Sequence, residues 1–242
     1  AYFATSARIL SQTAALLGKN AEAQKYQALA EKVKEAYIAT VIGKDGRMTP
    51  DTQAAYVRVL AFDLAPQTLR PGIVENLVRL IRTEGNHVGT GFLSTAFLCQ
   101  VLMENDRLDV AYELLNQTTA PSWLYEVSKG ATTVWELWDG IREDGSVNPS
   151  ASLNHYSPGA IANFLHCTVA GIEAAEPGYK RITIHPRPGG GLTSAAATYQ
   201  SAHGLIASEW KQEAGRMSLS VTIPPNTRAK IVLPGASLGQ TL

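Results

Sequence analysis

The segment GYKRITIHP, residues 178–186, marks a change in the hydrophobic pattern of the chain. Before it, apolar residues recur three and four positions apart, which is typical of one face of a helix. From it onward, apolar and polar residues alternate, as in a β-strand with one buried face. We therefore predict a helical region over residues 1–177 and a β region over residues 178–242, with the boundary near residues 174–180. The first helical stripe consists of Ala7, Leu10, Ala14 and Leu17.

The helical region is predicted to contain helical hairpins. Gly18 signals the end of a first helix, and Asn20 is the expected N-cap of a long second helix. Short connections and helices that are apolar around most of their girth indicate hairpins packed in two layers, continuing to about residue 173. No fixed repeat period occurs, so a repeat solenoid is the weaker alternative. Further helices are expected over residues 52–64, from Pro71, from Phe92 and over residues 108–115.

The β region is predicted to be an antiparallel β-sandwich. Its short alternating segments are separated by glycine and proline turns at regular intervals, a pattern that is typical of such sandwiches. The expected strands cover residues 181–186, 194–200, 205–211, 216–223 and 228–233.

The composition excludes several classes of protein. With 45% hydrophobic and 17% charged residues over 242 positions, the chain is globular and not disordered. Lys+Arg and Asp+Glu both number 21, so the basic surface of a nucleic-acid binder is not expected. No apolar run reaches membrane-spanning length, so no membrane partner is predicted. Ala1 is not an initiator Met and already resembles helix interior, so we expect the natural N-terminus upstream and leave the compartment open: periplasmic, secreted or cytoplasmic.

Two motifs point to chemistry on carbohydrates. In GATTVWELWDG, residues 130–140, two tryptophans flank Glu136. A carboxylate held against indole rings can lose hydration and act in acid–base catalysis, and flat rings suit the C–H face of a sugar. The second motif, SLNHYSPGA at residues 152–160, puts Asn, His and Tyr side by side before an expected helix. The plainer alternative for the first motif is a helix start with two core tryptophans and a solvated Glu136.

Together the two motifs resemble the signature of the inverting α-L-rhamnosidase family of glycoside hydrolases. That signature runs approximately GATT(I/V)WExWxG and then (S/F)(F/L)NHY, and the similarity extends across nearly the whole chain. The resemblance implies a bacterial (α/α)6 barrel of six helical hairpins followed by a β-sandwich. It also implies a rhamnose-containing carbohydrate as the partner. Since only about three or four hairpins precede Gly178, we expect a partial barrel that lacks its first half.

The resemblance also implies roles for individual residues. Glu136 occupies the position of the catalytic base, and His155 that of the histidine that contacts rhamnose hydroxyls. Trp138 is a candidate for the sugar-facing wall, and Trp123 could line the cleft, although core packing competes for both. Trp135 is expected in the core.

An inverting enzyme also needs a general acid, roughly 6.5–9.5 Å from the base. In the family this acid lies on a DERLGW-type stretch of the first barrel half, and the chain has no such stretch. Asp139 could share a helical face with Glu136, but it is expected to close the turn before Gly140. We therefore expect the acid on an upstream segment, an isolated chain that is inactive, and exposed helix faces that bind the missing N-terminal part or a second copy. A non-catalytic carbohydrate-binding or helical interaction module is the alternative.

The sequence gives no signal for a cofactor or a metal. Cys99 and Cys167 lie in apolar helical surroundings and are expected to be buried free thiols. The histidines outside the second motif lack mutual metal-ligand spacing. A phosphate-binding loop and a nucleophilic serine elbow are both missing from the sequence.

Overall fold

The computed structural model describes residues 1–235, so the last seven positions of the predicted β region lie outside the described residues. The chain divides into two compact units, Ala1–Pro158 and Gly159–Leu242. The boundary predicted near residues 174–180 stays a prediction. None of the helices in the described part of the chain is long and apolar enough to cross a membrane.

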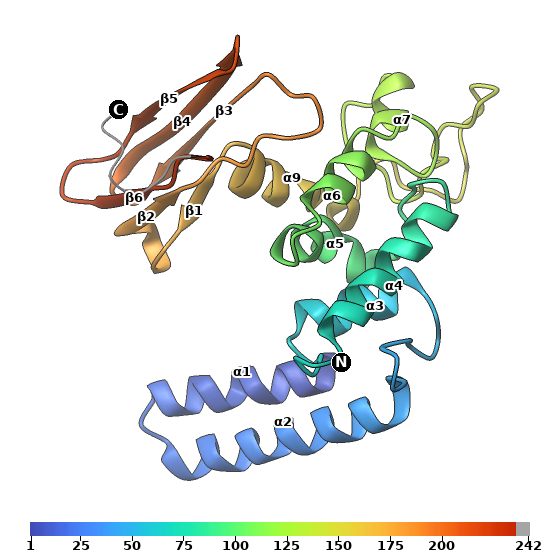
Figure 1. Ribbon diagram of the computed structural model, residues 1–242, viewed down its shortest axis with the longest axis vertical. Coiled ribbons are helices and arrows are strands. Elements are labelled where there is room, and N and C mark those ends of the chain that lie inside the picture. Colours follow the sequence, from blue (N-terminus) through green and yellow to red (C-terminus); the bar gives the residue numbers. More distant parts are fainter. Residues whose placement is uncertain (236–242) are drawn as a thin grey trace. The chain divides into compact units, whose positions relative to one another are not determined.

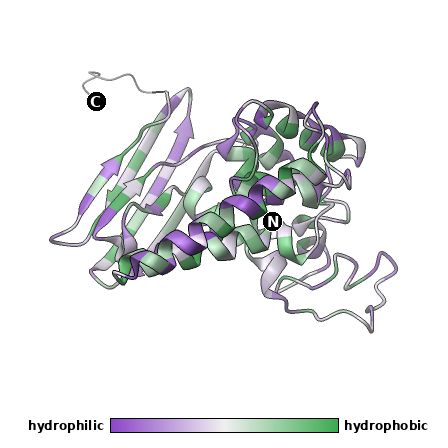
Figure 2. Cartoon of the chain, turned by 90° about the horizontal axis from the view of Figure 1, so that it is seen from below, coloured by the Kyte–Doolittle hydropathy of each residue, from purple (hydrophilic) through white to green (hydrophobic). Residues whose placement is uncertain are grey.

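The first unit begins with a hairpin of two long helices, α1 (Tyr2–Leu16) and α2 (Asn20–Val41), which lie side by side (Figure 1). Gly18, at a φ of 70°, ends α1 as expected, whereas Lys19 and not Asn20 is the N-cap of α2. Ser11 Oγ donates a hydrogen bond to the Ala23 carbonyl across the hairpin at 2.8 Å. Hydrophilic and hydrophobic residues are mixed along the helices of this unit (Figure 2). On α2 the buried residue is Ala30.

The stripe predicted for α1 is only half right. Ala7 and Ala14 are buried, but Leu10 and Leu17 are exposed. The residues that α1 buries are Ala4, Ala7, Ser11 and Ala14. Small side chains allow the two helix backbones to approach closely, so the larger apolar residues of α1 are left on the outer face.

Five shorter helices complete the hairpins. Thr52 caps α3 by accepting the Ala55 amide hydrogen on its side chain, and this helix ends earlier than predicted because Asp63 adopts a positive φ of 54°. The helices are α3 (Gln53–Ala61), α4 (Arg70–Thr83), α5 (Phe92–Glu104), α6 (Leu108–Leu115) and α7 (Trp123–Ser128). Their shared core is formed by fully buried side chains, among them Tyr56, Leu77, Ile81, Leu98, Leu102 and Leu114.

The predicted helical character is wrong over residues 129–155, which form turns and an isolated bridge between Ile141 and Val147. The plainer alternative for the first motif, a helix start, is therefore also wrong. Gly130 has a φ of 78°, which ends the helical backbone. The Trp135 amide then donates to the Glu126 side chain and the Glu136 amide to the Ser152 carbonyl, instead of to carbonyls four residues back as in a helix. Glu136 and Asp139 therefore do not share a helical face.

The second unit begins with short helices and contains two three-stranded sheets. In the first sheet β1 (Ile172–Ala174) pairs antiparallel with β2 (Arg181–Ile184), which pairs parallel with β6 (Arg228–Ile231). The second sheet is an antiparallel meander of β3 (Ser194–Ser201), β4 (Gly204–Glu213) and β5 (Arg216–Thr222). The helices are α8 (Tyr156–Gly159), which ends at the start of this unit, α9 (Ile161–Phe164), the π-helix η1 (Leu165–Val169) and the 3-10 helix η2 (Pro177–Tyr179).

The two sheets share one hydrophobic core. Ile172, Ile182 and Ile184 of the first sheet pack with Ile206 of the second. Trp210 is fully buried, and its indole N–H donates to the Val169 carbonyl at 2.7 Å.

The predicted order of helical hairpins followed by packed β-sheets is confirmed. β1 was missed because three residues are too few to show alternation, and the parallel pairing of β2 with β6 departs from the antiparallel prediction.

Candidate active site

Backbone hydrogen bonds bring the two sequence motifs together. The Glu136 amide donates to the Ser152 carbonyl at 2.8 Å, and the His155 amide donates to the Val134 carbonyl at 2.8 Å. The Ser152 amide donates in turn to Glu136 Oε2 at 3.0 Å. Residues 134–136 therefore run alongside residues 152–155, and the half-buried Glu136 side chain is held at one of its two oxygens.

A side-chain contact strengthens this pairing. Thr133 Oγ1 donates to the Leu153 carbonyl in a short hydrogen bond. Ser152 Oγ donates to the Asn154 carbonyl at 3.0 Å and accepts the Asn154 amide at 3.2 Å, so it closes a small turn just before His155. The three residues before the histidine are thus fixed by hydrogen bonds to their backbone and to the Ser152 side chain.

His155 is held in one orientation and one tautomer. Its ring stacks on Phe92, the first residue of α5, with the ring centroids 4.4 Å apart, and on Tyr156 at 5.1 Å. Nδ1 accepts the Ser157 amide at 3.2 Å, and the Ser157 hydroxyl donates to the Phe92 carbonyl at 2.5 Å. Since Nδ1 is an acceptor, the neutral ring carries its proton on Nε2, which can donate to a hydroxyl or a carboxylate.

The three tryptophans near the motifs occupy different environments. Trp135 is 2% exposed and belongs to the core, as expected from the sequence. Trp123 is also buried, at 6% exposure, and its indole N–H donates to the Pro158 carbonyl at 3.0 Å. Trp138 is half-buried and meets Trp123 edge to face, with the centroids 5.4 Å apart. Trp138 therefore offers ring surface to solvent, and Trp123 supports it from beneath.

Asp139 is engaged in the turn that follows the first motif. Both of its carboxylate oxygens accept from the Asn148 side chain at 3.3 Å, and the Arg142 guanidinium lies 4.0 Å away. The Asn148 amide donates to the Gly140 carbonyl at 2.9 Å. A Cβ on Gly140 would lie 2.9 Å from Trp135 Cε3, so this glycine lets the turn pack on the buried indole.

Glu126 of α7 was not singled out by the sequence analysis. It is 2% exposed, and its Oε2 accepts the Trp135 amide at 3.1 Å. Burial raises the pKa of the Glu126 carboxyl to about 7, although the bond from the Trp135 amide acts in the opposite direction. The available signal was its position three residues after Trp123, which places a charged residue on the buried face of a helix.

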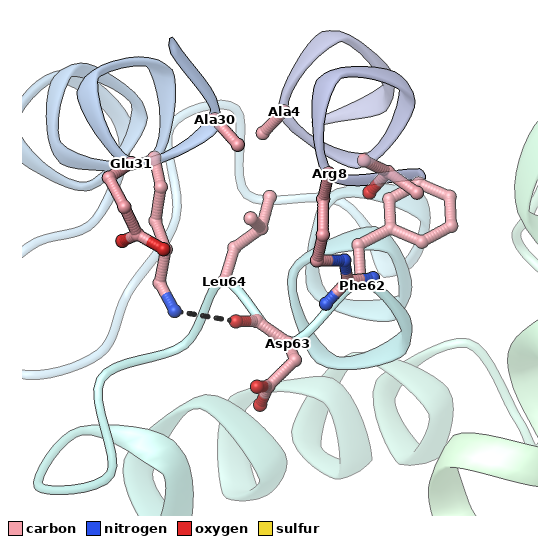
Figure 3. Close-up of a pocket in the computed structure, with 9 residues that line it drawn as sticks. Ala4, Arg8, Ala30, Glu31, Phe62, Asp63 and Leu64 are labelled. Atoms are coloured by element: carbon pink, nitrogen blue, oxygen red, sulfur yellow. Dashed lines mark hydrogen bonds between the residues drawn. The ribbon is translucent and has the colours of Figure 1, made fainter. Parts of the chain in front are cut away.

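A separate cavity of about 160 Å³ lies between α1, α2 and the residues that follow α3 (Figure 3). Lys34 Nζ donates to the Asp63 carbonyl at 2.9 Å at its rim, as the dashed line in Figure 3 shows. None of Glu136, His155, Trp138 and Trp123 lines it. Its lining combines small apolar residues with the charged side chains of Arg8, Glu31, Lys34 and Asp63.

Both cysteines are free thiols, and Cys99 is buried as predicted, but the predicted burial of Cys167 is wrong. Burial raises the pKa of Cys99 to about 12, so this thiol stays protonated and inert. Cys167 is half-buried, and its pKa is raised by burial and by the charge of Glu173. Within residues 1–235, no group of three or more His, Cys, Asp or Glu side chains is arranged to hold a metal ion.

Comparison with known proteins adds family information to this geometry. The family model for the bacterial alpha-L-rhamnosidase 6 hairpin glycosidase domain matches residues 1–169, and that for the bacterial alpha-L-rhamnosidase C-terminal domain matches residues 171–240. An alpha-L-rhamnosidase of Streptomyces avermitilis is 41% identical over 236 residues, which is 97% of this chain and 23% of the relative. One of Formosa agariphila is 39% identical over 97% of this chain and 26% of the relative.

Solved structures of such enzymes have the same fold over this length. The crystal structure of the Streptomyces avermitilis alpha-L-rhamnosidase complexed with L-rhamnose has a TM-score of 0.90 and covers 95% of this chain and 22% of that one. The structure of the native enzyme from Aspergillus terreus has a TM-score of 0.91 at 35% identity, over 96% and 28% of the two chains. The chain thus spans about a quarter of the length of the curated relatives it matches.

Proposed function

The chain belongs to the bacterial alpha-L-rhamnosidase family, and from that premise we propose that it carries the general base of an inverting glycoside hydrolase. The proposed reaction is the release of terminal α-L-rhamnose from glycosides or polysaccharides. One observation carries the proposal: residues 134–136 are hydrogen-bonded to residues 152–155, so the carboxylate of Glu136 and the ring of His155 lie on paired segments of one loop system.

Glu136 is the proposed base. Inversion requires a carboxylate that removes a proton from water while the water attacks the sugar carbon from the face opposite the leaving group. The Ser152 amide donates to Glu136 Oε2, which fixes the orientation of the carboxylate and leaves the proton transfer to its other oxygen. A half-buried carboxylate on a hydrogen-bonded loop needs little reorganisation to act in this way.

His155 and Trp138 are the proposed sugar-binding residues. The tautomer set by the Ser157 amide gives His155 an Nε2–H donor, which suits a sugar hydroxyl. Trp138 offers ring surface on which the apolar face of rhamnose can stack. Trp123, beneath it, is proposed to hold Trp138 in place by its edge-to-face contact.

The general acid is proposed to come from outside this chain. Asp139, the nearest carboxylate along the sequence, is already bound by Asn148 and lies close to Arg142. Glu126 is buried and bonded to the Trp135 amide. We therefore expect the isolated chain not to hydrolyse rhamnosides, because an alkoxide leaves slowly unless an acid supplies a proton.

The outer face of α1 supports the same conclusion. Several large apolar residues of α1, and Leu17 directly after it, are exposed, and we propose that a partner covers them. The proposed partner is an N-terminal part of a longer parent chain, or a second copy of this chain if that part is not present. The exposed residues are Phe3, Ile9, Leu10, Leu16 and Leu17.

The proposal is tested by comparing four proteins on an aryl α-L-rhamnoside: the isolated chain, the longer parent, and Glu136→Gln in each. The parent should turn over the substrate, Glu136→Gln should lower its rate at least ~10²-fold, and the isolated chain should be inactive. If the parent keeps most of its activity with Gln at this position, the proposed base is wrong. If the parent is inactive on every rhamnoside but binds L-rhamnose, the binding-module alternative replaces the proposal.

A further inference from the structure

Glu126 is a buried glutamate on helix α7. A charged side chain is rarely buried to 2% exposure unless it has a partner. Its Oε2 accepts the Trp135 amide at 3.1 Å, whereas Oε1 is buried and has no hydrogen-bond partner among the described residues. Burial of such a group with one bond is costly, so its retention needs a reason.

The bond made by Glu126 connects α7 to the residue directly before Glu136. The Glu126 carbonyl also accepts the Ala131 amide at 3.1 Å, so one residue of α7 fixes both ends of the segment 131–135. The next amide along the chain, that of Glu136, donates to the Ser152 carbonyl at 2.8 Å. Two successive amides are therefore held by two different partners, the Glu126 carboxyl group and the Ser152 carbonyl.

We propose that Glu126 is a positioning residue for Glu136: its buried carboxyl group accepts the Trp135 amide and so fixes the backbone from which Glu136 reaches the substrate. This inference rests on the proposed role of Glu136 as the base. Positioning matters because a catalytic group displaced by about 1 Å can lose on the order of 10²-fold in rate. Glu126 itself is buried, so its proposed role is to hold the backbone and not to contact the substrate.

The same surroundings favour the neutral form of the carboxyl group. An ionised carboxylate with one oxygen buried and unpartnered would be strongly destabilised, and burial raises the pKa of this group to about 7. In the acid form, Oε2 accepts the Trp135 amide as a neutral carbonyl oxygen does. Glutamine offers the same acceptor with nearly the same shape, whereas methionine fills the space without accepting a strong hydrogen bond.

The test uses Glu126→Gln and Glu126→Met in the longer parent protein, with Glu143→Met as the matched control. Glu143 lies on the neighbouring loop with its side chain 80% exposed, so the same substitution there should change kcat less than twofold. Glu126→Met should lower kcat at least ~10-fold with KM changed less than threefold, because the loss is in orientation and not in sugar contacts. Glu126→Gln should restore kcat to within ~3-fold of the unaltered protein.

Hydrogen exchange provides a readout that does not depend on activity. The peptide covering residues 131–136 should exchange faster in Glu126→Met and at the original rate in Glu126→Gln, because only the first substitution releases the Trp135 amide. If Glu126→Met fails to fold, the Gln variant decides: a kcat loss as large as ~10-fold, or faster exchange in this peptide, overturns the inference.

The remaining outcomes separate this inference from the proposed function. Normal kcat in Glu126→Met overturns the positioning role, while a large effect of Glu136→Gln in the same assay leaves the proposed base standing. If Glu136→Gln itself has no effect, the proposed base falls and the positioning role falls with it.

Discussion

The β3–β4–β5 sheet and the loop of residues 129–155 are held together by hydrogen bonds of different kinds. In the sheet, each strand pairs with its neighbour over seven or eight consecutive positions, from Ser194 with Lys211 to Ser201 with Gly204, and from Ala207 with Thr222 to Glu213 with Arg216. In the loop, the backbone is held by separate hydrogen bonds and not by a ladder. Several of these bonds involve a side chain, such as those from the Trp135 amide to Glu126 and from the Ser152 amide to Glu136.

This difference separates stability from function. A ladder of backbone bonds tolerates most changes of polar side chain, because each bond is independent of residue type. A loop held by individual side chains loses its geometry when one residue changes. We therefore expect substitutions in the sheet core to affect stability most, and substitutions in the loop to affect catalysis more than stability.

The largest expected effect on stability is in the β unit. Trp210→Ala removes a fully buried indole and leaves the Val169 carbonyl without its donor. We expect the free energy of unfolding of this unit to fall by roughly 3–5 kcal/mol, measured by urea denaturation. Lys211→Ala, at the exposed neighbouring position, serves as the control and should change stability by less than about 0.5 kcal/mol. An effect of similar size in both variants would show that the buried indole is not what stabilises the sheet.

The second effect is a pH dependence that originates at Glu126. Its pKa is raised from 4.5 to about 7 in the folded protein, so between these values the folded state holds a proton that the unfolded state has released. Stability should therefore fall as pH rises from about 4.5 to about 7 and stay level above, by roughly 3 kcal/mol at most. The measurement is the free energy of unfolding in urea at a series of pH values from 4.5 to 8. Glu126→Gln should remove this part of the pH dependence and be the more stable protein at pH 8; identical profiles for both proteins would contradict the assignment.

The third effect is at the turn behind Glu136. A Cβ on Gly140 would lie 2.8 Å from Leu153 Cδ2 and 2.9 Å from Trp135 Cε3, so Gly140→Ala must displace one of the two segments that form the site. We expect a loss of about 1–3 kcal/mol in stability, together with a fall in kcat of the parent protein. Gly145→Ala is the control: Gly145 has a φ of 82° but no atom within 4 Å of an added Cβ, so it should affect stability modestly and kcat little. Equal kcat losses in the two variants would mean that contact with Trp135 and Leu153 is unimportant.

The smallest expected effect is at Asp139. Since Asn148 and Arg142 already engage its carboxylate, Asp139→Asn should change kcat less than about threefold on a rhamnoside with a poor leaving group. A poor leaving group must be protonated as it departs, so loss of the true general acid would lower kcat by about 10²-fold or more. A loss of that size for Asp139→Asn would identify it as the acid and reject the proposed upstream acid.

The contrast between the regular sheet and the irregular loop also explains which elements could be predicted from the sequence. The strands β2 to β6 were found within a few residues, because alternation and glycine turns are local signals. Residues 129–155 were wrongly included in the predicted helical region. The hydrogen bonds that shape this loop, from the Trp135 amide to Glu126 and from the Glu136 amide to Ser152, join residues too far apart for hydrophobic periodicity to reveal. On the outer face of α1, Leu10 was expected inside because hydrophobicity alone does not show which stripe faces α2.

The two motifs identified the candidate site residues, but they did not predict how these residues are arranged. Nothing in the local sequence indicates that the Ser152 amide binds the Glu136 carboxylate or that Phe92, far back along the chain, stacks on His155. Glu126 was not predicted because a glutamate in a short helix is normally solvated, and its spacing from Trp123 was the one local sign of its burial.

The most direct test of the central claim is chemical rescue of Glu136→Ala in the parent protein, with an aryl α-L-rhamnoside and added azide. Removing the base should lower turnover at least ~10²-fold, and azide, which needs no base, should restore it by attack from the face that the water normally uses. We predict a rhamnosyl azide of inverted anomeric configuration, identified by NMR. Turnover that stays near the original level without azide, or a rescued product of retained configuration, would contradict the assignment of Glu136 as the base of an inverting enzyme.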